Sequence, residues 1–544
     1  MSARLHDGFT AQAQRRPEAI AVVHRDRALT YGALETMSNQ LAHLLVALGC
    51  RRGDRVGLLL PKVPEAIVAI LGALKADAIY VPLDPAGPAA RLARILEVAD
   101  CRVVLAAGSV ESMLRDALAA AALQRPPLVG RLDDALRPQD DPQPVFSLHD
   151  LAPHPTTPRA SNATGDDIAH ILFTSGSTGT PKGVTIAHRN AVHFIRWATH
   201  YFGIAPADRI SQQPPLHFDL STFDVFGTLW SGAQLHLVPP ELSLLPHKLV
   251  QFIRDAQLTQ WFSVPAVLNL LATFDAFDAV DDNDFPALRR VLFAGEVLPT
   301  TTLIYWMQRL PHARFTNLYG PTETTISSCR YTVPQCPRDV RAPIPLGTPC
   351  DGEQVLLLDE QMRPVADGQI GEIYIRGPGV SPGYWRDPER TRVAFLPAPG
   401  ATDPSERIYK TGDLAHRGAD GLLYFHGRAD MQIKCRGYRV ELGEVEAALH
   451  ALPGLRESAV VAIPSDGFEG ALLCCAYVGE TIGAERLRGE LAALVPAYML
   501  PQRWLRVDAL PKNPNGKIDR PRLKETFARA ETASAERSAA GAAT

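Results

Sequence analysis

Long hydrophobic runs are missing from this 544-residue sequence. The longest apolar stretches, such as Ala66 to Leu74 and Ala471 to Val478, are far too short to cross a lipid bilayer. The first residues, Met1 to Ala21, carry charges and lack the apolar segment of a signal peptide. We therefore expect a cytoplasmic protein without a membrane span.

Cysteine pairs and an excess of one charge are missing as well. The eight cysteines include no Cys-x-x-Cys pair, which predicts reduced thiols and no structural zinc. The 55 basic and 59 acidic residues give a net charge of −4, so we expect neither a dedicated nucleic-acid binder nor a polybasic membrane anchor. The remaining classes include soluble enzymes.

The alternation of apolar segments predicts an α/β fold for the first part of the chain. The whole chain is too long for one core, so two to four domains are expected. Thr30 suits the N-cap of a helix from Tyr31 to Leu48, after which strand-like and helix-like segments alternate. This rhythm predicts mostly parallel sheets covered by helices. The alternating segments are a strand at Arg55–Leu60, a helix at Ala66–Lys75 and a strand at Ala78–Leu83.

The pattern changes after Gly352, where short strands are separated by Gly, Asp and Pro. This texture predicts a β-rich subdomain, with strands at Gln354–Leu358, Glu372–Arg376 and Leu422–Phe425. The stretch from Met431 to about Ala528 mixes strands and helices and has the length of a small domain. The residues after it, 529–544, are rich in Ala, Ser and Glu and are expected to be disordered.

One segment, Phe173 to Val184, has the composition of a phosphate-binding loop. Glycines let backbone amides converge on an anion, the hydroxyl groups add donors, and Lys182 adds a positive charge. The segment is not a Walker loop, because Pro181 stands where that motif has glycine. A flexible Gly/Ser loop is the alternative on this segment alone. The candidate phosphate-binding residues are Thr174, Ser175, Gly176, Ser177, Thr178 and Lys182.

Six further segments, read together with this loop, resemble the adenylate-forming superfamily. The match is specifically to the adenylation domains of non-ribosomal peptide synthetases, and it extends from about Leu29 to Arg520. One departure is Asp77, where the family usually has glycine. The segments occur in the order found in the family: Leu74–Asp84, Asn317–Thr324, Gly371–Gly377, Tyr409–Asp413, Gly427–Asp430 with Gln432–Glu441, and Pro514–Arg520.

The resemblance implies an α/β enzyme with two domains. A large N-terminal core, residues 1–429, would bind ATP and the amino acid and combine mostly parallel sheets with a β-rich subdomain. A small, mobile α+β lid, residues 430–528, would rotate about a hinge at Asp430. In the first half-reaction a carboxylate attacks the α-phosphorus of ATP and releases pyrophosphate. In the second, the phosphopantetheine thiol of a carrier protein takes the acyl group.

The resemblance also implies roles for individual residues. Lys517 matches the catalytic lysine that bridges the substrate carboxylate and the α-phosphate, Thr322 would donate to that phosphate, and Lys434 matches a lid lysine of the thiol-transfer step. Glu323 matches the ligand of Mg²⁺, which prefers few carboxylates plus phosphate oxygens. Outside the motifs, Lys517 would be read as a solvated lysine, Tyr319 as a core residue, and Asp413 with Arg428 as a surface ion pair. The residues expected around the nucleotide are Gly295, Asn317, Tyr319, Asp413 and Arg428.

Asp219 indicates an α-amino acid as the substrate. It matches the aspartate that pairs with the substrate ammonium, and a carboxylic acid without an amino group would leave this carboxylate uncompensated. A helix-capping aspartate is the alternative. The aligned pocket resembles those of L-proline activators, which predicts proline or a close cyclic relative, with alanine or another small apolar amino acid second. It departs from them at Ser263 and Ser327, and the smaller Ser263 would leave room for something bulkier or more polar than proline. The other aligned residues are Leu220, Phe223, Ser263, Leu292, Ala294, Leu318, Ile326 and Ser327.

A carrier domain is not expected in this chain, because only 24 residues follow Arg520. We therefore expect a ligase that loads a separate carrier protein in trans, or a piece of a larger synthetase. Two alternatives stay open at this point. One is an aryl- or acyl-CoA ligase, and the other is a catalytically silent homologue that binds nucleotide.

Overall fold

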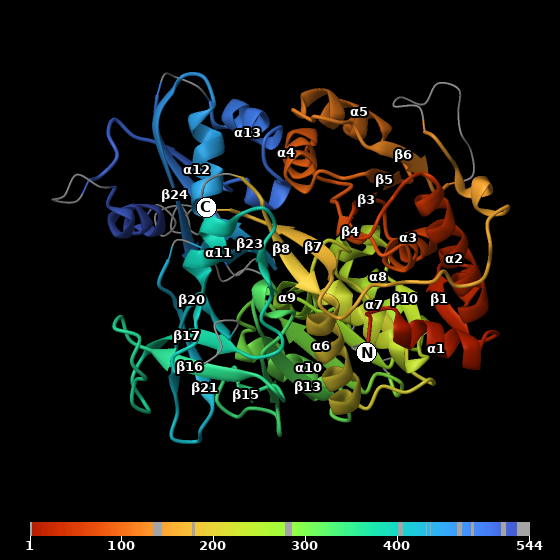
Figure 1. Cartoon of the computed structure of the whole chain (residues 1–544). Helices are drawn as coiled ribbons and strands as arrows, with labels where there is room; N and C mark the ends of the chain where they lie inside the picture. Colours follow the sequence, from red (N-terminus) through yellow and green to blue (C-terminus); the bar gives the residue numbers. More distant parts are fainter. Residues whose placement is uncertain are drawn as a thin grey trace, which may run out of the picture.

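The computed structural model of the chain contains three regions, which Figure 1 shows side by side. A large α/β region formed by the N-terminal part (red to green) adjoins a β-rich region (teal) and a small C-terminal region (blue). The structure describes residues 3–133, 144–176, 180–277, 285–400, 406–430, 432–435, 437–464, 471–479, 483–512 and 518–529.

Two mostly parallel sheets form the large region. In the seven-stranded sheet only the strands β8 and β18 run antiparallel to their neighbours. Its strands, in spatial order, are β18 (Gly383–Tyr384), β8 (Lys182–Ala187), β7 (Ile168–Thr174), β4 (Ile79–Pro82), β3 (Arg55–Leu59), β5 (Val103–Ala106) and β6 (Leu128–Arg131).

The nine-stranded sheet has a parallel centre and antiparallel strands at both edges. The end of its strand β13 carries part of the candidate site. Its strands, in spatial order, are β15 (Thr348–Pro349), β14 (Cys329–Thr332), β13 (Arg314–Tyr319), β12 (Arg290–Ala294), β11 (Gln260–Ser263), β9 (Arg209–Gln212), β10 (Gln234–Leu237), β1 (Ile20–His24) and β2 (Arg27–Thr30).

Helices join the two sheets into one core. Every residue of α3 is buried, as expected of a helix that is apolar on all sides. One hydrophobic cluster contains Leu58 of the first sheet, Leu292 of the second and Phe223 of α7. The helices of the large region are α1 (Asp7–Arg15), α2 (Tyr31–Ala47), α3 (Pro64–Lys75), α4 (Ala89–Ala99), α5 (Glu111–Ala120), α6 (His188–Phe202), α7 (Leu220–Ser231), α8 (Pro246–Asp255), α9 (Pro265–Thr273) and α10 (Thr300–Arg309).

The β-rich region is a five-stranded antiparallel sheet with one helix beside it. Its sheet brings the ends of β20 and β21 next to the large region. Its elements are β16 (Gln354–Leu358), β17 (Gly371–Arg376), α11 (Pro388–Ala394), β19 (Phe395–Pro397), β20 (Arg407–Arg417) and β21 (Leu423–Arg428).

The small C-terminal region has hydrophobic clusters of its own. It holds a two-stranded hairpin, a three-stranded sheet and helices that include residues 520–529. Within the described ranges, no helix has both the length and the hydropathy needed to span a bilayer. The named elements are β22 (Gln432–Cys435), β23 (Tyr438–Glu441), α12 (Leu442–His450), β24 (Leu455–Pro464), β25 (Ala471–Gly479), α13 (Ala484–Ala492) and β26 (Arg503–Arg506).

The predicted α/β architecture, with a β-rich subdomain and a small α+β region, is confirmed. Thr30 caps α2 as predicted, since its hydroxyl accepts a hydrogen bond from Ala33 N at 3.1 Å. The departure at Asp77 has a structural reason. Its φ is +59°, a conformation that favours glycine, and the aspartate side chain binds Arg159 and Ser161. The tail for which disorder is predicted, residues 529–544, lies outside the described residues, apart from residue 529, which belongs to a helix.

Two buried histidines predict that the protein loses stability in acid. His170 of β7 stacks on Tyr80, and His188 at the start of α6 accepts a hydrogen bond from Leu5 N at 3.0 Å. Burial lowers the pKa of His170 to about 3 and that of His188 to about 4. The unfolded chain therefore binds protons below pH 6.5 that the folded chain excludes, so stability is present above pH 6.5 and is lost as the pH falls.

The expected loss is about 2 kcal/mol per histidine between pH 8 and pH 5. Urea unfolding at pH 8, 6.5 and 5 measures this free energy. His170→Phe keeps an aromatic ring against Tyr80 and removes one titrating group, so about 2 kcal/mol of the loss should disappear. A variant that keeps the full pH dependence would show that His170 is not responsible.

Candidate active site

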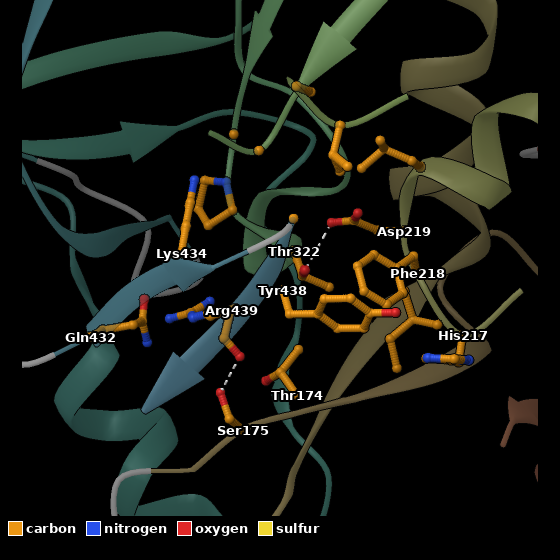
Figure 2. Close-up of a pocket in the computed structure, with 18 of the residues that line it drawn as sticks. Thr174, Ser175, His217, Phe218, Asp219, Thr322, Gln432, Lys434, Tyr438 and Arg439 are labelled. Atoms are coloured by element: carbon orange, nitrogen blue, oxygen red, sulfur yellow. Dashed lines mark hydrogen bonds between the residues drawn. The ribbon is translucent and has the colours of Figure 1, made fainter. Parts of the chain in front are cut away.

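The largest group of sequence-predicted site residues lines a cavity where the three regions meet. The cavity encloses about 110 Å³, and Figure 2 shows the side chains around it. The ends of the strands β7, β12, β13 and β21 contribute one wall, and the hairpin β22–β23 of the small region contributes another. The cavity-lining residues that the sequence had singled out are Thr174, Ser175, Asp219, Leu220, Ala294, Gly295, Thr322, Ile326, Asp413, Arg428 and Lys434.

Among the described residues, Asp219 is one of two acidic residues that line this cavity. Its carboxylate accepts a hydrogen bond from the Thr322 hydroxyl at 2.7 Å, drawn as a dashed line in Figure 2. Burial away from bulk solvent raises its pKa, although the side chain remains accessible from the cavity itself. The helix-capping alternative is wrong, because Asp219 makes no side-chain cap bond at the start of α7. A cation placed in the cavity would restore its usual ionisation.

The wall beside Asp219 is apolar and shallow. Leu220 and Ile326 face the cavity, whereas Phe223 lies behind them with its ring 5.5 Å from that of Phe194 and 6.0 Å from that of Phe262. Phe223 therefore belongs to the hydrophobic core behind the cavity lining. The residues predicted for the pocket that are buried behind the lining are Phe223, Ser263, Leu292, Leu318 and Ser327.

The hydroxyl groups of the two serines in the predicted pocket form hydrogen bonds with other protein atoms. Ser263 accepts from the Trp261 indole N–H at 3.0 Å, and Ser327 lies 2.9 Å from the Cys329 carbonyl oxygen, to which it donates. The interpretation that a small Ser263 leaves room for a bulkier substrate is therefore not supported, since the Trp261 indole lies against it.

The predicted nucleotide residues gather around Asp413. Its carboxylate accepts from the Tyr319 hydroxyl at 2.7 Å and pairs with Arg428. The ion pair is buried, with 4% and 11% of the two side chains exposed, so the surface-pair alternative is wrong. Gly295 lies beside the cavity with a φ of +101°, a conformation suited to glycine. Asn317 is buried and donates to the Pro345 carbonyl oxygen at 2.8 Å.

Glu323 is an acidic residue that contacts two cationic side chains. Its carboxylate is fully buried and contacts Lys182 at 3.2 Å, Arg439 at 2.6 Å and the Tyr384 hydroxyl at 2.8 Å. Burial alone would raise the pKa of Glu323, but Arg439 and Lys182 hold it far below the usual range. Glu323 is thus ionised, which is the state that a ligand of Mg²⁺ needs.

The small region closes the cavity with residues of its hairpin. Lys434 points into the cavity, and enclosure by protein lowers its pKa. The Ser175 hydroxyl donates to the Arg439 carbonyl oxygen at 2.7 Å, and Gly437 N donates to Glu296 at 2.6 Å. Motif matching gave Lys434 a role but missed Arg439 and Glu296. Arg439 is a cation within the same motif, which was the available signal.

A second buried ion pair joins the small region to the large one. Arg91 of α4 pairs with Glu444 of α12, and the side chains are only 9% and 2% exposed. The other Glu444 oxygen accepts from Gly176 N of the phosphate loop at 3.1 Å. Tyr438 and Tyr498 stack nearby, with ring centroids 3.6 Å apart. The sequence carried no signal for this pair, because 353 residues separate its members.

Three sequence-predicted residues, Ser177, Thr178 and Lys517, lie outside the described residues. Within the described ranges, no three His, Cys, Asp or Glu side chains converge on a point that could hold a metal ion. A metal ion at Glu323 would therefore need additional oxygens from water or another molecule, such as a nucleotide phosphate.

Comparison with known proteins adds sequence relatives. The profile of the AMP-binding enzyme family matches residues 9–385, and that of the AMP-binding enzyme C-terminal domain matches residues 444–517. The L-proline--[L-prolyl-carrier protein] ligase of Streptomyces coelicolor is 37% identical over 96% of this chain and 95% of its own length. Tyrocidine synthase 3 of Brevibacillus parabrevis is 35% identical over 97% of this chain. The chain spans only 8% of that protein and 45% of phosphinothricin tripeptide synthetase PhsC of Streptomyces viridochromogenes, which is 37% identical over 96% of this chain.

Solved structures give the same relationship. The Vibrio cholerae adenylation domain AlmE, in complex with glycyl-adenosine-5'-phosphate, has a TM-score of 0.83 and 25% identity, with 97% of this chain and 98% of AlmE covered. The amide bond synthetase McbA from Marinactinospora thermotolerans has a TM-score of 0.84 and 26% identity, with 96% and 99% covered. This chain belongs to the AMP-binding enzymes of the adenylate-forming superfamily and is similar to the adenylation domains of non-ribosomal peptide synthetases.

Proposed function

We propose that this protein activates a small apolar amino acid with ATP and transfers it to the phosphopantetheine thiol of a carrier protein. The observation that carries the proposal is Asp219, a carboxylate beside an apolar pocket wall. A substrate ammonium there would compensate the acid and fix the amino acid in one orientation. The similarity to a prolyl-carrier protein ligase and to AlmE with its bound glycyl-adenosine-5'-phosphate supports an amino acid as the substrate.

In the first half-reaction the chain's residues orient the two reactants. Asp219 would hold the ammonium. The Thr322 hydroxyl donates to Asp219 in this structure and would turn to donate to the α-phosphate when ATP is bound. A carboxylate oxygen forms a bond to the α-phosphorus while the bond between this phosphorus and the bridging oxygen breaks, and pyrophosphate leaves with the electron pair. Lys517 would stabilise the charge that develops on the phosphate oxygens.

The nucleotide would lie between the phosphate loop and Asp413. Asp413 can accept hydrogen bonds from ribose hydroxyls, Arg428 holds Asp413 in place, and the ring of Tyr319 would pack on the adenine. Mg²⁺, when bound at Glu323, would neutralise phosphate charge. Lys182 lies 3.2 Å from Glu323 and is available to the same phosphates.

For the second half-reaction we propose that residues 430–528 act as a lid that turns about Asp430. In the structure Lys434 of this proposed lid lines the cavity. In this position Arg439 contacts Glu323, and Glu444 contacts Gly176, so groups proposed for phosphates and Mg²⁺ already have partners. Pyrophosphate would therefore leave before this lid position forms. The thiol sulfur then bonds to the acyl carbon, AMP leaves, and the thiol proton passes to solvent.

Proline, or a close cyclic relative, is the proposed amino acid, with alanine second. Leu220 and Phe223 limit the depth of the pocket, and the lining beside Asp219 is apolar at Leu220, Ala294 and Ile326, which disfavours a charged side chain. ATP–pyrophosphate exchange across the proteinogenic amino acids, pipecolate and azetidine carboxylate tests this. A sharp proline signal is expected. Exchange with a different small amino acid would support the proposed mechanism but show that the proposed substrate is wrong.

Enlarging the pocket should change the preferred amino acid. Leu220→Ala removes a side chain that lines the cavity, which should lower kcat/KM for proline by about tenfold. Larger apolar amino acids such as leucine should gain by a similar factor. Exchange assays with both amino acids measure the ratio. If the ratio stayed constant, Leu220 would not contact the substrate side chain.

A further inference from the structure

Lys62 and Asp224 are two buried charged groups that the proposed chemistry does not use. Lys62 lies between β3 and α3 and is 8% exposed, and Asp224 lies in α7 and is 1% exposed. Neither oxygen of Asp224 has a hydrogen-bond partner among the described residues. Burying such groups costs several kcal/mol. Apolar side chains of similar size would usually serve stability better, so the pair indicates another role.

Lys62 connects the two sheets at the point where the substrate-binding segment begins. Its ammonium donates to the Gln213 carbonyl oxygen at 2.7 Å and lies 3.5 Å from that of Gln212, the last residue of β9. Lys62 itself follows β3 of the other sheet. The segment 213–219 leads from this contact directly to Asp219, which lies beside Thr322 in Figure 2.

The rest of this segment is held by its own hydrogen bonds. The Gln212 side-chain amide donates to Pro214 O at 2.5 Å, and the Ser221 hydroxyl lies 2.6 Å from Phe218 O. Lys62 fixes the start of the segment to the other sheet, and His217 further along lies 4.0 Å from Asp84, which follows β4 of that sheet. Any shift of the carbonyl groups at its start would move Asp219 within the cavity.

Asp224 supplies the charge that keeps an ammonium at this position. Burial lowers the pKa of Lys62 to about 7, while Asp224 and Glu241 act in the opposite direction. Burial raises the pKa of Asp224, and Lys62 is the cation that opposes this rise. The two groups therefore depend on each other for their charge.

We propose that Lys62 is a positioning residue for amino-acid recognition that holds the start of segment 213–219, and that the buried carboxylate of Asp224 favours the charged form of Lys62. Neither residue touches the substrate; both act through Asp219. The inference rests on the proposed function, because it needs Asp219 to bind the ammonium of an amino acid.

The test uses the full chain in ATP–pyrophosphate exchange with the amino acid that the wild type prefers. Lys62→Met should raise KM for the amino acid about tenfold with little change in KM for ATP. Asp224→Asn should also raise KM for the amino acid. Lys62→Arg should keep most of the wild-type affinity. In an Asp219→Asn background, where residual exchange is measured at high substrate, Lys62→Met should add less than twofold.

Lys75→Met is the matched control. Lys75 is also buried, at the other end of α3, but it binds Glu35, Ser38 and Asn39 away from the cavity. It should lose thermal stability without a change in KM. An unchanged KM in Lys62→Met and Asp224→Asn, or a full additional tenfold in the Asp219→Asn background, would overturn the inference. Should Lys62→Met fail to fold, Asp224→Asn decides by the same criterion. A wild type that exchanges with no amino acid would instead refute the proposed function.

Discussion

Asp219→Asn is expected to lower kcat/KM for the amino acid in ATP–pyrophosphate exchange by about a thousandfold. The substitution keeps the shape of the side chain and its neighbour Thr322 but removes the charge. A substrate ammonium would then be buried without a counter-ion, and losing one partner of a buried pair costs about 3–5 kcal/mol. KM for ATP should change little, because Asp219 belongs to the amino-acid side of the cavity.

Asp255→Asn, an exposed acid of α8, is the control and should behave as the wild type does. The substrate panel should also contain benzoate and a fatty acid. If Asp219→Asn left activity intact and these acids were activated, the aryl- or acyl-CoA ligase alternative would replace the amino-acid proposal. If the wild type bound ATP but gave exchange with no acid at all, the silent-homologue alternative would hold.

Residues inside contiguous motifs could be placed from the sequence, because such runs determine their own backbone. Thr30 caps α2 through a bond to a residue three positions away, and this local geometry is readable from residue type. Asp219, Thr322, Asp413 and Lys434 come from four separate motifs that the fold brings to one cavity. Their convergence was implied by the family resemblance and not by any property of the individual segments.

Contacts between remote segments could not be predicted in the same way. Lys62 binds a carbonyl group 151 residues away. This partner is a backbone atom, which every residue has, so no residue type in the sequence indicates it. The direction of a side chain was equally hidden. Ser263 could be aligned with a pocket position, but only the structure shows that its hydroxyl accepts from Trp261. The pair of Arg91 and Glu444 also depends on how the small region packs against the large one, and no local sequence pattern predicts that arrangement.

This lid contact gives the second large prediction. Arg91→Ala is expected to slow transfer of the acyl group from its adenylate to the carrier thiol by about a hundredfold, while ATP–pyrophosphate exchange stays within about twofold. The substitution would leave the Glu444 carboxylate buried, with Gly176 N as the hydrogen-bond donor that remains among the described residues. Breaking a buried pair costs about 3–5 kcal/mol, and this cost falls on the present lid position alone.

The two half-reactions separate a lid effect from a general loss. Single-turnover loading of a phosphopantetheinylated carrier, or of free pantetheine, reports the transfer step, and exchange reports adenylate formation. Arg386→Ala removes an exposed ion pair with Asp100 in the large region and should leave both rates unchanged. Glu444→Gln should follow Arg91→Ala in direction, since it too removes the pair. Equal losses in both assays would mean that the substitution damages the folded core. An unchanged transfer rate would mean that acyl transfer does not use the lid position in which Arg91 pairs with Glu444.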